Sequence, residues 1–291
     1  MSRELVVIDT SKLPLEEFRR GRVHMIRAKR MPVDTGIPGV HVEFSYSIVP
    51  DGYYTPSHRH NIDQIRYTLK GLQSTGHGDL AAGECGYFPE GVHYGPQKQV
   101  GDCECLVLQF QGPSGHRFLS NEEMNATYNK MIAAGAKFEN GVYTGINANG
   151  TKVNKDSYEA IWEEHEGREL VFPRGRYRAP VMMLSDCFGW MRDLKRPGVE
   201  MRHMGSFGEL RTEIGMLRLN AGAVIEEGVQ TEAEIRYLLE GSVGYGGQTW
   251  PVGTFFYLPN GAHREVLSAA DNAKFFCIAL PMISYLAALA A

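Results

Sequence analysis

The chain has 291 residues, of which 43% are hydrophobic and 22% charged, a globular composition that excludes bulk disorder. This length favours two domains or one duplicated domain. A formal net charge of −4 argues against nucleic-acid binding by bulk electrostatics, and no apolar stretch reaches the ~18 residues needed to span a bilayer. The odd number of cysteines, 5, indicates reduced thiols, and the charged start lacks the core of a signal peptide. We therefore expect a soluble cytoplasmic protein.

The first elements that the sequence predicts are strands. Residues 40–49 and 103–111 are rich in β-formers with rough alternation, and Gly, Pro and Asp punctuate the stretch between them. Many short strands with regular turns are typical of a jelly-roll sandwich or barrel. Residues 1–37 precede them as an N-terminal arm. The arm carries a basic cluster that we interpret as a solvated face: Arg19, Arg20, Arg22, Arg27, Lys29 and Arg30.

Residues 113–180 have a different pattern and are predicted to form a helical connector. Ser120 and Glu123 make a capping box ahead of apolar residues at helical spacing. A second helix is predicted from about residue 155 to residue 166, ending before Gly167. His165 lies beside three glutamates, but on an apolar helix face we interpret it as a packed histidine and not as a metal ligand.

Parts of the first half return later in the chain at a constant spacing. Residues 64–71 (QIRYTLKG) return as 234–241 (EIRYLLEG), and residues 87–93 (YFPEGVH) as 257–263 (YLPNGAH), each 170 positions on. A register held over this distance indicates a duplicated domain. We therefore expect two β-barrels related by a pseudo-twofold axis.

One stretch of the first copy concentrates residues with metal-binding chemistry. After Gly52 come five residues, then His58-Arg-His60, then three residues and Gln64. Alternation along a strand puts His58 and His60 on the same face, where they form a natural chelating pair. His93 is expected to arrive on another strand. Neutral imidazoles suit Fe(II), Ni, Cu or Zn, with open positions left for substrate or water.

These residues resemble the cupin superfamily, specifically the two-domain bicupins, whose motifs are G-x5-H-x-H-x3,4-E-x6-G and G-x5-P-x-G-x2-H-x3-N. The resemblance implies a mainly β fold of two cupin barrels, at residues 38–112 and 181–291. It also implies that His58, His60 and His93 ligate one divalent transition metal per chain, with Fe(II) favoured over Ni, Mn, Zn and Cu.

Two departures from the cupin pattern affect the expected site. Gln64 stands where most cupins have a ligating Glu. Its amide oxygen can coordinate weakly or hydrogen-bond a substrate, so Gln64 stays a candidate for both the metal and the catalytic set. The second departure is the spacing between Gly91 and His93, which is one residue shorter than the motif requires.

The second copy serves as an internal control. It has Gly228 and Gln230 at the positions of His58 and His60, so we expect its barrel to be metal-free although Glu234 and His263 remain. Arg66 and Tyr67 lie near the expected site of the first copy, where an arginine could hold a carboxylate. Their counterparts, Arg236 and Tyr237, recur beside the degenerate site, which favours a structural role for the pair and leaves a substrate role for Arg66 as the alternative.

Two further features have modest functional signals. Cys103 and Cys105 lie on one strand face and are interpreted as buried thiols and not as a metal or redox site. Residues 281–291 form an apolar, helix-prone tail too short to span a membrane. We expect this tail to pack on a barrel or on a second subunit, and the assembly to be a homodimer.

The resemblance leaves several functions open. The first is a mononuclear non-haem metal dioxygenase acting on a small oxygen-rich molecule, aromatic or dicarbonyl, because the His-Arg-His run followed by an arginine is similar to ring-cleaving bicupin dioxygenases of the gentisate and salicylate type. The second is a non-catalytic cupin that binds a small ligand for storage, sensing or regulation. The third is a metal-dependent isomerase or lyase, which the missing Glu base disfavours. All three imply a small-molecule partner, and none implies nucleic acid or membrane.

Overall fold

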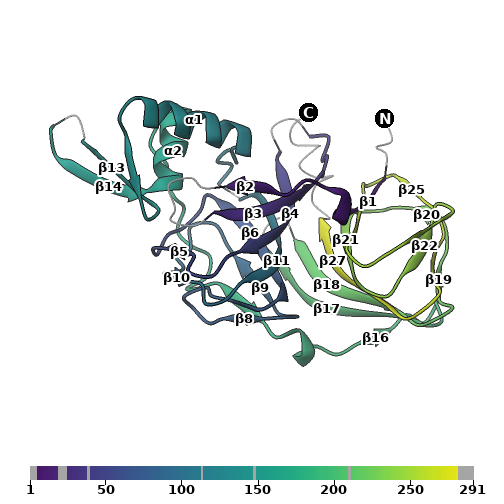
Figure 1. Ribbon diagram of the computed structural model, residues 1–291. Helices are drawn as coiled ribbons and strands as arrows, with labels where there is room; N and C mark the ends of the chain where they lie inside the picture. The colour runs from purple at the N-terminus through teal and green to yellow at the C-terminus, as the bar shows by residue number, and fades with distance from the viewer. Residues whose placement is uncertain are drawn as a thin grey trace. The chain divides into compact units, whose positions relative to one another are not determined.

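The computed structural model describes residues 5–18, 25–37, 40–112, 114–146, 149–208 and 211–280. The chain divides into two compact units, each built around one β-barrel (Figure 1). The first barrel unit contains Leu15–Lys29 and Val40–Met183. The second barrel unit contains Met1–Pro14, Arg30–Gly39 and Leu184–Ala291. The apolar tail and residues 19–24 of the basic cluster lie outside the described residues. In the part of the chain that is described, no helix is long and apolar enough to cross a membrane.

The first barrel unit has a seven-stranded sheet in the order β15-β9-β6-β11-β4-β3-β2. Two short pairs, β5 with β10 and β7 with β8, complete the barrel. Its strands are β2 (Glu16–Phe18), β3 (Ile26–Met31), β4 (Val42–Val49), β5 (Tyr54–Thr55), β6 (Ile62–Lys70), β7 (Leu72–Gln73), β8 (Leu80–Ala81), β9 (Cys85–Phe88), β10 (Gln97–Lys98), β11 (Cys103–Gln111) and β15 (Val181–Met183). Strands β4 and β11 confirm the two runs predicted from alternation.

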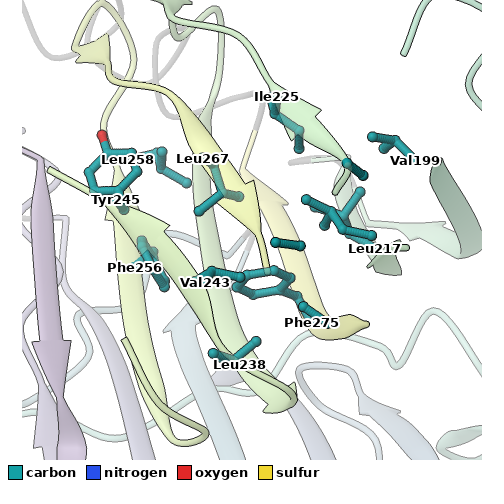
Figure 2. Close-up of a cluster of buried hydrophobic side chains, with 14 residues drawn as sticks. Val199, Leu217, Ile225, Leu238, Val243, Tyr245, Phe256, Leu258, Leu267 and Phe275 are labelled. Carbon is teal, nitrogen blue, oxygen red and sulfur yellow. The ribbon is translucent and has the colours of Figure 1, made fainter. Parts of the chain in front are cut away.

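The second barrel unit has the corresponding seven-stranded sheet, in the order β1-β24-β21-β27-β18-β17-β16. A four-stranded sheet, β19-β26-β22-β23, and the pair β20-β25 complete it. Its strands are β1 (Val6–Asp9), β16 (Met191–Arg192), β17 (Val199–Phe207), β18 (Thr212–Leu219), β19 (Val224–Ile225), β20 (Gly228–Val229), β21 (Ala233–Glu240), β22 (Val243–Tyr245), β23 (Gln248–Trp250), β24 (Thr254–Leu258), β25 (His263–Arg264), β26 (Leu267–Ala269) and β27 (Ala273–Leu280). A cluster of buried aliphatic and aromatic side chains lies in this barrel (Figure 2).

The strand registers of the two barrels repeat with the spacing seen in the sequence. Pairings of the inner strands in the first barrel have counterparts 170 positions on: His58↔Tyr94 with Gly228↔Arg264, Gln64↔Phe88 with Glu234↔Leu258, and Arg66↔Val107 with Arg236↔Cys277. Positions in the two interiors can therefore be compared one by one.

The edge strands depart from the expected domain boundaries. Strand β1, in the expected N-terminal arm, pairs with β24 of the second barrel. Strand β15, placed by the sequence in the second domain, pairs with β9 of the first. The edge strand of the second barrel, β1, thus comes before the first barrel in the sequence. The edge strand of the first barrel, β15, comes just before the strands of the second. A boundary drawn from motif spacing misses this exchange, because strand pairing over long sequence distances leaves no local signal.

The connector belongs to the first barrel unit and is only partly helical. Helix α1 (Asn121–Ala133) begins at the capping box that the sequence predicts, and helix α2 (Ser157–Glu166) ends at Gly167 in the left-handed conformation. A three-stranded sheet that the sequence did not predict accompanies them: β12 (Lys137–Glu139), β13 (Val142–Ile146) and β14 (Lys152–Asp156). Figure 1 shows β13 and β14 as a teal hairpin beside the two helices. Trp162 and Ile161, both fully buried, lie in the core of this region. His165 is half-buried and has Thr127 as a hydrogen-bond partner at 3.0 Å.

Candidate functional site

A cavity of about 190 Å³ lies inside the first barrel. Alternation directs every second residue of β4, β6 and β11 inward, which brings Ser45, Gln64 and Gln109 to its wall. The connector closes another side with Asn121 and Tyr158, at the first turns of α1 and α2. The connector is therefore part of the candidate site and not a passive link.

Two of the predicted metal ligands face this cavity together. His58 and His60 both line it, with ring centroids 4.9 Å apart, and His58 is 3% exposed. The ring nitrogen Nδ1 of His58 lies 2.8 Å from the carbonyl oxygen of Pro56. Because a carbonyl can only accept, Nδ1 donates and Nε2 carries the lone pair. This hydrogen bond orients an imidazole as metal sites commonly require.

The third predicted ligand, His93, does not join them. Its side chain is exposed and is not part of the cavity wall, whereas the next residue, Tyr94, is 2% exposed and lines the cavity. Neighbouring residues of an extended segment point to opposite sides, so only one of the two can face inward. The missing residue in the Gly91–His93 spacing accounts for the correction: the motif's full spacing ends at Tyr94.

Gln64 and Arg66 also reach the cavity, joined to Tyr94 in one hydrogen-bond network. Arg66 Nε donates to Gln64 Oε1 over 2.5 Å, and Arg66 Nη2 donates to the Tyr94 hydroxyl over 2.9 Å. That hydroxyl lies 3.2 Å from His60 Nδ1. Arg66 is 8% exposed, and its guanidinium carbon lies 4.3 Å from the centroid of the Phe88 ring. Its hydrogen-bond partners Gln64 and Tyr94 are neutral, and no carboxylate pairs with it among the described residues.

The equivalent place in the second barrel holds an ion pair. Arg236 donates to both carboxylate oxygens of Glu234 over 2.8 Å. Burial opposes the ionisation of Glu234, but the charge of Arg236 holds the pKa of this carboxyl below its usual value. Arg264, at the position of Tyr94, donates to Gln230 over 3.3 Å. His263 is exposed and, like His93, does not belong to this inner cluster.

A buried salt bridge fixes the outer side of the histidine motif. Arg176 Nη2 contacts both carboxylate oxygens of Asp63, at 2.7 and 2.8 Å. Burial is the largest influence on Asp63 and raises its pKa despite this cation. Gly91 has φ +73° and packs against the backbone at Pro173, three residues before Arg176. A Cβ on Gly91 would meet the carbonyl oxygen of Pro173 at 2.6 Å. The turn that delivers Tyr94 therefore requires glycine.

Sequence reasoning missed several residues of the wall. The cavity is also lined by Tyr94, Gln73, Gln97, Gln99, Asn121 and Tyr158. Cys105, which the sequence predicts to be a buried thiol beside Cys103, lines it too. A hydrogen bond with Cys103 is the main cause that lowers the pKa of Cys105. Comparing the two copies position by position would have revealed the glutamines, since Gln73 and Gln97 align with Val243 and Leu267.

The side chains at the cavity fit a metal ion with fewer imidazole ligands than the sequence predicts. Two imidazoles line the cavity with the Tyr94 phenol and the Gln64 amide, and His93 is outside. The carboxylate of Glu43 also lines the cavity, where it accepts a hydrogen bond from Asn121 over 2.8 Å. Within the residues that the structure describes, no group of three or more His, Cys, Asp or Glu side chains is placed to hold a metal ion. The arrangement therefore suits coordination by two nitrogen ligands with neighbouring oxygen donors, in place of the expected three imidazoles.

Comparison with solved structures identifies the fold. The chain is similar to a proposed dioxygenase from Nostoc punctiforme, with a TM-score of 0.67 at 14% identity, covering 96% of this chain and 83% of that one. It is also similar to oxalate decarboxylase of Lactobacillus farciminis in complex with formate, with a TM-score of 0.54 at 13% identity and coverage of 97% and 87%. A mutant of Bacillus subtilis oxalate decarboxylase is similar with a TM-score of 0.55 at 13% identity, covering 94% of this chain and 76% of that one. Neither protein-family models nor curated proteins give a match. The fold is mainly β and of the cupin type.

Proposed function

We propose that the cavity of the first barrel is the active site of a metal-dependent enzyme that acts on a small, oxygen-rich organic acid. The observation that carries this proposal is the convergence of His58, His60 and Arg66 on one buried cavity. The second barrel, which has Gly228 and Gln230 at the histidine positions, would have a structural role only.

His58 and His60 would hold one divalent transition metal, with Fe(II) as the first expectation. Gln64 and Tyr94 supply oxygen atoms at the cavity wall, and Arg66 hydrogen-bonds to both. A metal bound there would provide open coordination positions and redox or Lewis-acid chemistry. The predicted ligand set is thereby revised: His93 is replaced by the two oxygen donors as candidates to complete the coordination.

Arg66 would anchor a carboxylate of the substrate. A buried cation without a counter-charge is unfavourable, and its counterpart Arg236 is neutralised by Glu234. In the first barrel the corresponding residue is the neutral Gln64, so the positive charge remains available. Arg66 Nη1 makes no hydrogen bond with the described residues, and guanidinium groups bind carboxylates through paired N–H donors.

An O2-dependent oxidation is the reaction that we propose first. The similarity to a proposed dioxygenase supports this reaction at the level of the fold. The similar oxalate decarboxylases are named for a small carboxylic acid, which supports an acid as the substrate. The chain's own contribution would be to orient the acid through Arg66 in a cavity that the connector borders.

Metal analysis of matched histidine variants tests the proposal. Protein purified without chelators should contain about one metal per chain, and His58→Ala or His60→Ala should lose most of it. His93→Ala and His263→Ala are the controls and should retain it, since both side chains are exposed. Oxygen uptake with a panel of small acids then tests turnover, and equal metal content in all five proteins would contradict the assignment.

A non-catalytic ligand-binding cupin is the second candidate. It is favoured by the position of Arg66, whose cation lies in hydrogen-bond contact with both oxygen donors and would disfavour a second positive charge. Metal-free protein that binds small acids and consumes no O2 would establish this alternative. The isomerase or lyase alternative would show turnover without O2.

A further inference from the structure

The interiors of the two barrels differ in chemistry although their strands match in register. A cluster of buried apolar side chains lies in the second interior, as Figure 2 shows for Leu217, Val243, Leu267 and Phe275, and the Glu234–Arg236 ion pair is buried in the same barrel. The strand pairs that carry these residues have counterparts in the first barrel at the same 170-residue spacing: Cys105↔Ser47 with Phe275↔Leu217, and Gln97↔Thr55 with Leu267↔Ile225.

Polar or thiol side chains replace seven members of this apolar cluster in the first barrel. The matched pairs are Ser47 for Leu217, Thr55 for Ile225, Thr68 for Leu238, Gln73 for Val243, Gln97 for Leu267, Gln99 for Ala269 and Cys105 for Phe275. All seven first-barrel residues are buried, and five of them line the cavity. Stability alone does not explain the exchange, since the second barrel shows that this fold closes well with aliphatic side chains.

The protein itself satisfies these polar groups only in part. Gln97 Nε2 donates to the Ser74 carbonyl over 3.0 Å, and Gln99 Nε2 donates to the Leu72 carbonyl over 2.6 Å. By contrast, Gln73 Oε1, Thr55 Oγ1 and Thr68 Oγ1 are buried side-chain atoms without a hydrogen-bond partner among the described residues. Of these three residues, Gln73 alone lines the cavity. A buried polar atom without a partner is unfavourable and rare in folded proteins, so it calls for an explanation.

We infer that the first barrel binds a small aliphatic acid bearing several hydroxyl groups. This inference rests on the proposed function, because it places the substrate in the same cavity and its carboxylate on Arg66. The hydroxyl groups would exchange hydrogen bonds with the glutamine and serine side chains of the wall. Val49 and Val107 line the cavity too and would receive the C–H faces of such a molecule.

The cavity disfavours an aromatic acid without ring hydroxyls for the same reason. An unsubstituted benzene ring has no hydrogen-bonding groups at its edge, so it would leave the buried amides of the wall without partners. A site built to hydrogen-bond hydroxyl groups rejects analogues that lack them. The cavity volume of about 190 Å³ further restricts the ligand, because drug-sized pockets run from about 300 to 1,000 Å³.

Matched carboxylates provide the probes. Quinate, cyclohexanecarboxylate and benzoate share one carboxylate on a six-membered ring, but quinate alone carries ring hydroxyls. Gluconate and hexanoate form the open-chain pair. Isothermal titration calorimetry of the protein as purified should show at least tenfold tighter binding for the hydroxylated member of one pair or both, about 1.4 kcal/mol. Equal or tighter binding of benzoate, or no binding of either hydroxylated acid at about 10 mM, would overturn the inference.

Variants that introduce the second-barrel residues test which side chains cause the preference for hydroxylated acids. Gln73→Val and Gln97→Leu should abolish the advantage of the hydroxylated acid and leave benzoate binding unchanged, whereas Arg66→Gln should weaken all the acids. Gln73→Val also removes an unpartnered oxygen, so its melting temperature should not fall. A hydroxyl preference that survives both substitutions would contradict the assignment to this wall.

Failure of the inference and failure of the proposed function are distinguishable. Metal bound through His58 and His60 without a hydroxyl preference would leave the proposed function standing and remove the substrate class. A preference for hydroxylated acids in protein that binds no metal would support the substrate class and contradict the proposed function. Should one variant not fold, the comparison of acids on the unmodified protein still decides the question.

Discussion

His58 and Tyr94 face each other across an antiparallel backbone bridge. His58 N donates to Tyr94 O over 3.0 Å, and Tyr94 N donates to His58 O over 2.9 Å. Because this exchange fixes the direction of both residues, the two side chains lie together, with ring centroids 4.5 Å apart. A shift of one residue would turn His93 inward and Tyr94 outward. The identity of the third group at the histidine pair is thus set by backbone pairing.

The first prediction follows from this bridge. Tyr94→His should place a third imidazole beside His58 and His60 and raise the affinity for a divalent metal, by about tenfold or more, about 1.4 kcal/mol. Competition with a metal-sensitive dye measures the change. His93→Ala is the control and should leave the affinity as it is. A larger loss from His93→Ala than from His60→Ala would show that the solution structure uses the other register.

The second prediction concerns the charge of the cavity. Gln64→Glu recreates the pair that Glu234 and Arg236 form in the second barrel, so the introduced carboxylate should neutralise Arg66. Binding of small carboxylates should weaken at least tenfold, about 1.4 kcal/mol, as measured by calorimetry. Unchanged or tighter carboxylate binding would mean that Arg66 is not the anchor.

The third prediction concerns the ion pair of the second barrel. Glu234→Ala leaves Arg236 buried without its partner and should lower the free energy of unfolding by about 3–5 kcal/mol in denaturant titration. Because the pKa of Glu234 is held below its usual value of 4.5, its stabilisation is complete above that value. It is lost as the pH falls through the lowered folded-state pKa. Glu234→Gln should flatten this acid limb, and an unaltered acid limb would contradict the pairing.

The fourth prediction tests the docking of the connector on the motif. The Tyr158 hydroxyl donates to Asn61 Oδ1 over 2.6 Å, and Asn61 is fully buried. Tyr158→Phe should therefore cost about 1–3 kcal/mol of unfolding free energy, as thermal or chemical denaturation measures it. Tyr128→Phe is the matched control, because Tyr128 packs in the connector without a hydroxyl hydrogen bond among the described residues. Equal effects of the two substitutions would exclude a specific role for the Tyr158 hydroxyl.

Local signals predicted much of the fold. The capping box at Ser120 and the glycine stop at Gly167 predicted both helices, since capping depends on residues within one turn. The exchange of β1 and β15 and the sheet of β12–β14 were not predicted. Strand exchange depends on long-range pairing, and β14 consists mainly of polar residues without a clear alternating pattern.

The candidate site was predicted in part. Alternation correctly paired His58 with His60, because residues two apart on an extended segment share a face. It could not choose between His93 and Tyr94, since a one-residue difference in motif spacing decides which of them points inward. The network of Gln64, Arg66 and Tyr94 joins three segments and becomes visible only in three dimensions.

Anomalous X-ray scattering from crystals of the protein, grown without chelators, tests the central claim most directly. The account predicts one metal peak inside the first barrel, about 2.0–2.2 Å from a ring nitrogen of His58 and of His60, with His93 not coordinated. No corresponding peak should occur between Gln230 and Glu234 in the second barrel. A metal ligated by His93 or located in the second barrel would contradict the account, as would the absence of a peak at His58 and His60.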